Sequence, residues 1–408
     1  MRNLLPVCML LTFCVACGSS KEESPTPPTT DAPDVSSPDT GEPTQWQFEL
    51  VKGPLTLNSD GRAVFANVLL DGETVIATYQ TAPPDTLNTD KNLYFRTYDR
   101  SLGEIDGEET AIDVHVPLTI DGKDVLDFDG DLGGHKLVLM NDLIYFVAIL
   151  KGREDVAYMA FDKSFKPMAG PLYFGIEQKK IEAHLDMGFC GDGHHLYAQF
   201  FYQNGETPPE EWGASIYQLS PDMEQKNHAL VYPDEGTFVT GTSCVFVPAG
   251  QMGVTADRLQ IFSTNKAYGD PKRVGIHTFA ADMMLEFVAG SRSDIIVEDL
   301  DVYFPTGPSY NATHQLWVVG YTMENAEGEH GMKDKSVELG PSFIQIFDAD
   351  WKPIQTIPVN GGEAAFRVMT QTEGDDLYVV FDEMDKYGWA ESSRARIEHY
   401  RISKVPSQ

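Results

Sequence analysis

Two heptapeptides far apart in the chain are close copies of each other: Phe161-Asp162-Lys163-Ser164-Phe165-Lys166-Pro167 and Phe347-Asp348-Ala349-Asp350-Trp351-Lys352-Pro353. Each follows a short run rich in apolar residues and begins with an aromatic–acid pair, which is typical of the end of a β-strand. Because the similarity extends to the strands before the heptapeptides, the chain is predicted to be built from copies of one supersecondary unit.

Six copies of this unit can be followed along the sequence. Each has a tight polar turn, a strand, a loop and a second strand that ends near an aromatic residue or leucine. The second strands recur at spacings of 63, 58, 60, 68 and 53 residues, counted from Tyr98, Phe161, Leu219, Phe279, Phe347 and Tyr400. A period of this length leaves room for four strands with connections, which is the size of a propeller blade.

Alternation such as Ile344-Gln345-Ile346 supports strands, and helical periodicity is nearly absent, so the fold class is all-β. In its repeat form the chain resembles six-bladed β-propeller proteins over residues 46–408. The resemblance implies a closed ring of six four-stranded blades. The sequence motifs of sialidase-type propellers and of the forty-residue repeat class are both missing. Seven blades, or a stacked pair of β-sandwiches, are the alternative architectures.

The chain ends indicate how the ring closes. The last copy ends with Tyr400-Arg401-Ile402, which is the third strand of its blade, and too little sequence follows for a fourth. Residues 46–51 alternate apolar and polar ahead of the first copy, so we expect them to pair with residues 397–402 as the missing outer strand. The alternative is a free N-terminal strand that caps one face.

The N-terminus carries an export signal. Arg2 precedes a short apolar run, and Val15-Ala16-Cys17 places small residues before a cysteine. The segment resembles a bacterial lipobox, in which the cysteine is acylated and the preceding peptide removed, although Cys14 departs from the usual pattern. The resemblance implies a signal peptide at residues 1–16 and lipidation of Cys17. An ordinary cleaved signal peptide and a soluble protein is the alternative.

Residues 17–45 are predicted to form a disordered tether between the acylated cysteine and the propeller domain. The segment is rich in Pro, Ser, Thr and Asp and has no aromatic residue, so it cannot bury enough apolar surface to fold. Gly18 follows the cysteine, which by resemblance to the lipoprotein sorting rule favours the outer membrane. We therefore expect a lipid-anchored protein of the bacterial cell envelope, facing the periplasm or the cell surface.

The net negative charge of the chain limits which molecules it can bind. The chain has 30 Lys and Arg against 62 Asp and Glu, a formal net charge of −32, which repels nucleic acid and anionic lipid headgroups. Such a surface attracts divalent cations, and it also serves solubility.

A protein or glycan ligand is the expected partner, bound at one end of the ring. In an up-and-down blade the loops between strands two and three lie at the same end as the blade-to-blade connections. These loops are long in several copies and carry aromatic side chains that form the predicted binding face. Neutral variation in loop length is the alternative. The aromatic residues are Trp212, Tyr268, Tyr387 and Trp389.

A weak Ca²⁺ site is predicted at Asp127, Asp129 and Asp131, because alternating carboxylates in a glycine turn can converge oxygens on a hard cation. The twelfth position of this loop is Val138, so it is no helical calcium hand, and a solvated acidic turn is the alternative. A Ca²⁺-assisted hydrolase of glycosidase or lactonase type, using carboxylates at the channel, is the second functional hypothesis. His194-His195 beside Asp192 offers either a metal pair or a polar turn.

Cys190 and Cys244 are predicted to form a disulfide. They lie 54 residues apart, close to one repeat, in segments that read as the innermost strands of consecutive blades. The oxidising cell envelope permits the bond, and free buried cysteines are the alternative.

Overall fold

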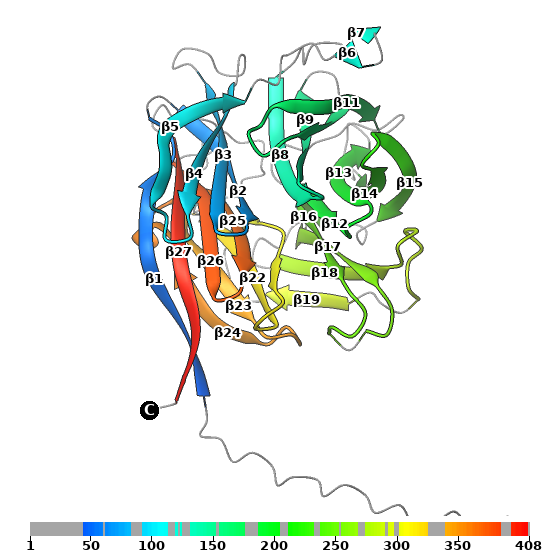
Figure 1. Ribbon diagram of the computed structural model, residues 1–408. Helices are drawn as coiled ribbons and strands as arrows, with labels where there is room; N and C mark the ends of the chain where they lie inside the picture. Colours follow the sequence, from blue (N-terminus) through cyan, green and yellow to red (C-terminus); the bar gives the residue numbers. More distant parts are fainter. Residues whose placement is uncertain are drawn as a thin grey trace, which may run out of the picture.

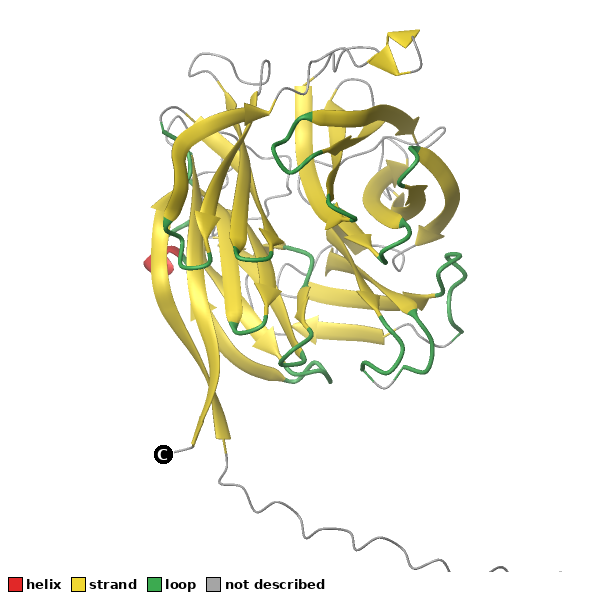
Figure 2. Cartoon of the chain, viewed as in Figure 1, coloured by secondary structure: helices red, strands yellow, loops and turns green. Residues whose placement is uncertain are grey.

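The fold is known from a computed structural model that describes residues 44–59, 62–82, 92–112, 119–120, 123–124, 131–151, 155–175, 187–204, 211–231, 237–252, 254–267, 274–289, 293–297, 302–324, 339–384 and 393–406. Strands dominate these residues, and their one helical element is the short 3₁₀ turn η1 (Asn360–Gly362; Figure 2). In this described part of the chain, no helix has the length and apolar character needed to cross a membrane.

Six antiparallel sheets form the blades of a ring, so the six-bladed propeller expected from the repeat is confirmed (Figure 1). Each blade runs from an inner strand to an outer strand in chain order, except that blade 6 takes its outer strand from the N-terminus, and that the inner strand of blade 5 comes in two pieces. The strands are β2 (Arg62–Asp71), β3 (Thr74–Ala82), β4 (Asn92–Asp99) and β5 (Glu104–Ile112) in blade 1; β8 (Asp131–Met140), β9 (Leu143–Lys151), β10 (Asp155–Phe161) and β11 (Pro167–Gly175) in blade 2; β12 (Gly188–Gly191), β13 (Leu196–Asn204), β14 (Glu211–Ser220) and β15 (Glu224–Val231) in blade 3; β16 (Thr237–Val247), β17 (Arg258–Ala267), β18 (Val274–Ala281) and β19 (Ser293–Val297) in blade 4; β20 (Val302–Pro305) and β21 (Ser309–Asn311), β22 (Leu316–Glu324), β23 (Leu339–Phe347) and β24 (Pro353–Pro358) in blade 5; and β25 (Ala365–Glu373), β26 (Asp376–Glu383), β27 (Arg394–Pro406) and β1 (Thr44–Thr56) in blade 6. A small hairpin of β6 (Thr119–Ile120) and β7 (Lys123–Asp124) stands between blades 1 and 2 in the chain.

The N-terminal strand closes the ring, as predicted. β1 pairs antiparallel with β27, with Phe48 opposite Ile402 and Leu50 opposite Tyr400. Trp46 and Phe48 also pack toward blade 5, against the cluster that contains Ile357. The N-terminal strand β1 therefore completes the sheet of blade 6 and also packs against blade 5. Figure 1 shows β1 and β27 running out of the ring together as a two-stranded ribbon.

Strand direction defines two ends of the ring. The turns between strands one and two and between strands three and four lie at one end, which we call the short-turn end. The connections between strands two and three, and those from blade to blade, lie at the other, which we call the long-loop end. Because β1 is antiparallel to β27, its first residue, Thr44, lies at the short-turn end. The chain therefore enters the ring at the end opposite the long loops.

The turn between strands three and four has the same construction in blades 1 to 5, which explains the repeated heptapeptide. An Asp or Ser side chain accepts hydrogen bonds from backbone N–H groups further along the turn, and the fourth residue has a positive φ of 59° to 65°. A large apolar residue in this conformation costs about 1 kcal/mol. Its packing between blades offsets that cost. The capping residues are Asp99, Asp162, Ser220, Asp282 and Asp348, and the apolar residues are Leu102, Phe165, Met223, Leu285 and Trp351.

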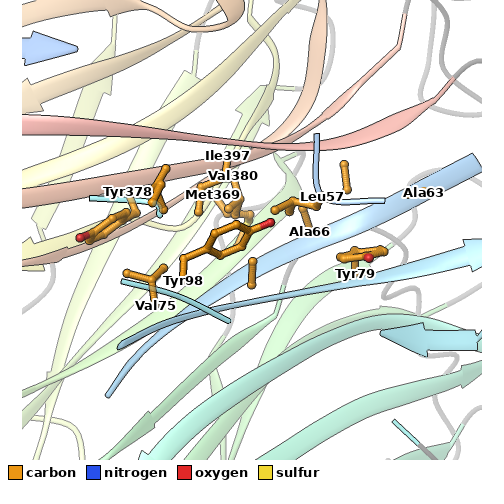
Figure 3. Close-up of a cluster of buried hydrophobic side chains, with 13 residues drawn as sticks. Leu57, Ala63, Ala66, Val75, Tyr79, Tyr98, Met369, Tyr378, Val380 and Ile397 are labelled. Atoms are coloured by element: carbon orange, nitrogen blue, oxygen red, sulfur yellow. The ribbon is translucent and has the colours of Figure 1, made fainter. Parts of the chain in front are cut away.

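Each such apolar residue packs against the preceding blade. Phe165 of blade 2 lies 4.3 Å from the ring of Phe95 in blade 1, and Trp351 of blade 5 lies 5.8 Å from the ring of Phe262 in blade 4, measured between ring centroids. Figure 3 shows the cluster between blades 6 and 1, where Tyr98 lies among Val75, Met369, Val380 and other buried side chains. The hydrophobic core is therefore a series of layers between blades.

Candidate functional site

Most of the predicted binding and metal residues lie outside the described part of the chain. Tyr268, Tyr387, Trp389, Asp127 and Asp129 belong to that group, and so does Cys17. Trp212 and Asp131 lie on described backbone, in β14 opposite Gln203 and at the start of β8 opposite Lys151, but their side chains are not described. The strand ends do place Trp212 toward the long-loop end of blade 3. The proposed binding face and the Ca²⁺ site therefore stay predictions.

The two cysteines of the predicted disulfide lie next to each other. Cys190 on β12 and Cys244 on β16 lie on the inner strands of neighbouring blades, as expected, with Cα atoms 5.8 Å apart and their Sγ atoms at bonding distance. Gly188 permits this approach, because a Cβ there would lie 2.9 Å from the backbone of Ser243. The bond itself stays a prediction that thiol chemistry can test.

A buried ion pair lies where the inner walls of blades 6 and 1 meet. Arg367 on β25 and Asp382 on β26 are almost fully buried, with Nη1 3.9 Å from Oδ2. The Asp382 carboxylate accepts hydrogen bonds from the backbone N–H groups of Phe65 (3.0 Å) and Ala66 (3.1 Å) in blade 1. The guanidinium carbon of Arg367 lies 4.4 Å from the centre of the Phe65 ring. The pair therefore joins the two blades.

Two matching irregularities make this junction possible. Each inner strand of the two blades contains a bulge. In β2 of blade 1 the bulge lies between Val64 and Asn67. In β25 of blade 6 it lies between Phe366 and Met369. A residue of positive φ lies in each bulge, Phe65 at 56° and Arg367 at 51°. A bulge bends a strand and re-aims side chains. Here it brings the backbone N–H groups of one blade to the carboxylate of the next.

His135 forms a second buried polar contact, between blades 1 and 2. His135 Nδ1 lies 2.9 Å from Gln80 Nε2, and its Nε2 contacts Thr78 Oγ1 (3.0 Å) and Asn67 Nδ2 (3.3 Å), all in blade 1. Burial, together with the charges of Arg367 and Lys136, holds the pKa of His135 well below its usual range. The imidazole is therefore neutral and fully occupied.

These inner-wall groups support the ring. The Asp382 oxygens accept backbone N–H groups of the neighbouring blade, both nitrogens of His135 have partners, and both side chains are almost fully buried. Burial raises the pKa of Asp382 to about 6, against the opposing effects of Arg367 and the two N–H groups. In the described residues, no group of three or more His, Cys, Asp or Glu side chains could hold a metal ion.

The His194–His195 segment is a polar turn. Asp192 Oδ1 accepts the backbone N–H groups of His194 and His195 (2.6 Å each), and Tyr197 donates its hydroxyl hydrogen to Oδ2 (2.9 Å). Burial raises the pKa of Asp192, but these hydrogen bonds outweigh it and bring the pKa below its usual value. Asp192 therefore holds the turn together.

Comparison with known proteins bears on the fold. No protein-family model matches the chain, and no curated protein matches it. Solved structures do. A mutant of an α-L-arabinofuranosidase from Fusarium graminearum, in complex with an iminosugar inhibitor, has a TM-score of 0.50 and 10% identity over 83% of this chain and 93% of its own.

Other solved structures are similar at lower scores. A member of the DUF4221 family from Bacteroides vulgatus has a TM-score of 0.47 and 9% identity, covering 89% of this chain and 99% of its own. An α-L-arabinofuranosidase from Podospora anserina has a TM-score of 0.44 and 12% identity, covering 89% and 98%. The similarity to the Fusarium graminearum enzyme, at a TM-score of 0.50 and 10% identity, supports the propeller architecture alone.

Proposed function

We propose that the protein is a lipid-anchored component of the bacterial cell envelope, in the outer membrane, that binds a protein or glycan with its long-loop end. The observation that carries the proposal is the entry point of the chain. β1 begins at Thr44 at the short-turn end, so a tether from Cys17 arrives at the end opposite the long loops. This arrangement leaves the variable connections free to meet a ligand.

The character of the inner wall also supports a binding module. The buried groups described there, Asp382 and His135, join blades and have their hydrogen-bonding atoms occupied. A rigid scaffold that carries long loops is a common arrangement for recognition. The net charge of −32 opposes nucleic acid as the ligand.

Ligand binding can be tested with full-length chain carrying Cys17→Ser, on an array of plant and bacterial polysaccharides and envelope proteins. We expect binding that Trp212→Ala and Trp389→Ala weaken about tenfold or more, the loss typical of an aromatic anchor. Phe287→Ala is the matched control, because Phe287 is an exposed aromatic residue at the short-turn end. Release of sugar from a bound polysaccharide would replace this proposal with the hydrolase hypothesis.

Membrane anchoring has its own test. Cys17→Ser should move the protein from the membrane fraction to the soluble periplasmic fraction, since the acylated thiol is the attachment point. The unchanged chain, treated in parallel, is the control. A mutant that stays in the membrane fraction would contradict lipid anchoring while leaving ligand binding open.

Calcium is a separate proposal. If Asp127, Asp129 and Asp131 bind Ca²⁺, the ion should raise the thermal unfolding temperature, and Asp129→Asn should abolish that increase. Asp350→Asn is a suitable control, because Asp350 is an exposed acid in the turn of blade 5. Equal stabilisation of both variants by Ca²⁺ would show that the ion acts on the general negative charge.

A further inference from the structure

The exposed large hydrophobic side chains of the described residues all lie near the short-turn end. Each lies in the turn between strands three and four, or within the first residues after it, or at the matching place on β1. Their exposed fractions run from 41% to 60%. The residues are Leu50, Val51, Ile105, Met168, Met284, Phe287 and Val288.

Several of these residues occupy equivalent positions. In five blades the outer strand has a bulge in its part near the short-turn end, where the register with strand three shifts. The bulge residues are Val51, Ile105, Met168, Lys226 and Ile354, so four of the five are apolar. Single exposed apolar residues are normal on a protein surface, but their repeated placement at one end indicates a surface that meets a partner.

Blade 4 has the largest group, Met284, Phe287 and Val288, which we call the blade-4 tip. The exposed fractions of these three side chains are 60%, 41% and 48%. Phe287 bridges to Ala281 of β18, and the Val288 N–H donates to the carbonyl of Ala280. The tip is therefore held to the sheet by its backbone while its side chains face outward.

Hydrogen bonds from the turn and from blade 3 hold the tip in place. Asp282 Oδ1 accepts the backbone N–H groups of Met284 and Glu286, at 2.9 Å each. The carbonyl of Met283 accepts a hydrogen bond from Gln218 Nε2 (2.8 Å) of blade 3, and the Tyr197 hydroxyl oxygen lies 3.2 Å from the same carbonyl. A rigid apolar surface loses little conformational entropy on binding. The tip is pre-organised for contact.

The location of the tether indicates what covers the tip. The chain enters the ring at Thr44, at this same end, and Cys17 lies 27 residues earlier. At about 3 Å per residue an extended tether permits the domain to reach the bilayer. We propose that the short-turn end faces the membrane, and that the blade-4 tip inserts its apolar side chains at the headgroup–acyl boundary of the bilayer that holds Cys17. This inference rests on the proposed lipid anchor.

Charge makes the contact shallow and dependent on lipid composition. Exposed acids share the short-turn end, among them Asp142, Asp350 and Asp375, whose side chains are 91%, 82% and 61% exposed. These carboxylates must stay in water, which limits the contact to the interfacial depth reached by surface-bound segments. Zwitterionic lipid should therefore favour the contact, and anionic lipid should weaken it by repulsion.

The test measures the depth of labels on the acylated, full-length protein in phosphatidylethanolamine–phosphatidylcholine vesicles. Met284→Cys carries an environment-sensitive fluorophore at the tip, and Arg394→Cys carries it on an exposed residue at the long-loop end of β27. We expect lipid-borne quenchers to reduce the tip signal about twofold more than the Arg394 signal, and phosphatidylglycerol to diminish the difference. The parent chain without an added cysteine gives the background.

A second variant and vesicle flotation separate the possible results. Phe287→Ser combined with Val288→Ser should abolish the quenching difference at the Met284 label, without changing flotation. Equal quenching at both labels, or none at either in a protein that floats, overturns the membrane-facing tip and leaves the anchor intact. Failure to float contradicts the anchor itself. A tip label that changes only when envelope protein is added identifies a protein partner and also overturns the proposal.

Discussion

Substitution of Asp382 tests whether burial or the charge of Arg367 controls this carboxyl group. The two possibilities predict opposite changes of folding stability with pH. Burial raises the pKa of Asp382 from 3.8 to about 6, although Arg367 lies nearby. A carboxyl whose pKa is higher in the folded state stabilises the fold at low pH, and that stabilisation is lost as the pH rises through the folded value. The difference between the two pKa values corresponds to about 3 kcal/mol of folding stability, which is lost between about pH 4 and pH 7.

The perturbation is Asp382→Asn, which cannot titrate. One amide oxygen can still accept the N–H of Phe65 or Ala66, but the amide NH₂ group then faces the other N–H, so the variant should be less stable by about 1–3 kcal/mol at pH 5. As the pH rises to 7.5, the wild type should lose about 1–2 kcal/mol relative to the variant. The cost of the substitution therefore shrinks as the pH rises.

The assay is denaturant unfolding followed by tryptophan fluorescence at pH 5.0, 6.0 and 7.5, on chains that both carry Cys17→Ser. Asp162→Asn is the matched control, whose cost should stay constant from pH 5.0 to 7.5. Hydrogen bonds from Ser164 and the Lys166 N–H lower the pKa of Asp162, so its contribution is present above its ordinary pKa and lost on acidification. A cost of Asp382→Asn that grows with pH would refute the reasoning, since it would mean that Arg367 outweighs burial.

Two further predictions concern contacts between blades. Gly320→Ala should lower the free energy of unfolding by about 3 kcal/mol, because the new Cβ would lie 1.9 Å from the carbonyl oxygen of Val368. Gly72→Ala, where a positive φ is the only obstacle, should cost about 1 kcal/mol, and equal costs in denaturant unfolding would contradict the close approach. If Cys190 and Cys244 are bonded, the mature protein, unfolded and unreduced, should show no thiol reactive to a titrant, and reduction should lower the unfolding free energy by about 2–4 kcal/mol. Two reactive thiols there would exclude the bridge.

The ring could be predicted from sequence because its signals are local and repeated. The strand patterns at residues 344–346 and 397–402 are those of β23 and β27. The alternation at residues 46–51 belongs to β1, which pairs with β27 as predicted, although residues 46–50 lie opposite 404–400. The copied heptapeptide also had a physical cause, which is the capped turn with a positive φ at Phe165 or Trp351. Spacing and alternation suffice when each repeat carries the same turn.

The inner wall could not be predicted, because bulges break the alternation that sequence patterns depend on. In β25 the bulge between Phe366 and Met369 changes which side Arg367 faces, so a charge in an apolar strand becomes a buried partner for Asp382. The partners of His135 come from another blade, and nothing nearby in sequence indicates them. The aromatic binding face was predicted from the length of the loops alone, so the ligand stays a proposal.

The pairing of β1 with β27 has a consequence for how the protein is made. Phe48 lies opposite Ile402, so the last sheet of the ring joins the first and last parts of the folded domain. A growing chain cannot complete that sheet until residues 394–406 have left the ribosome, and contacts of such sequence separation are slow to form. The waiting N-terminal segment keeps an unpaired edge in the meantime. Folding of the ring thus ends with the joining of β1 to β27, and loss of residues 394–406 would leave the ring open.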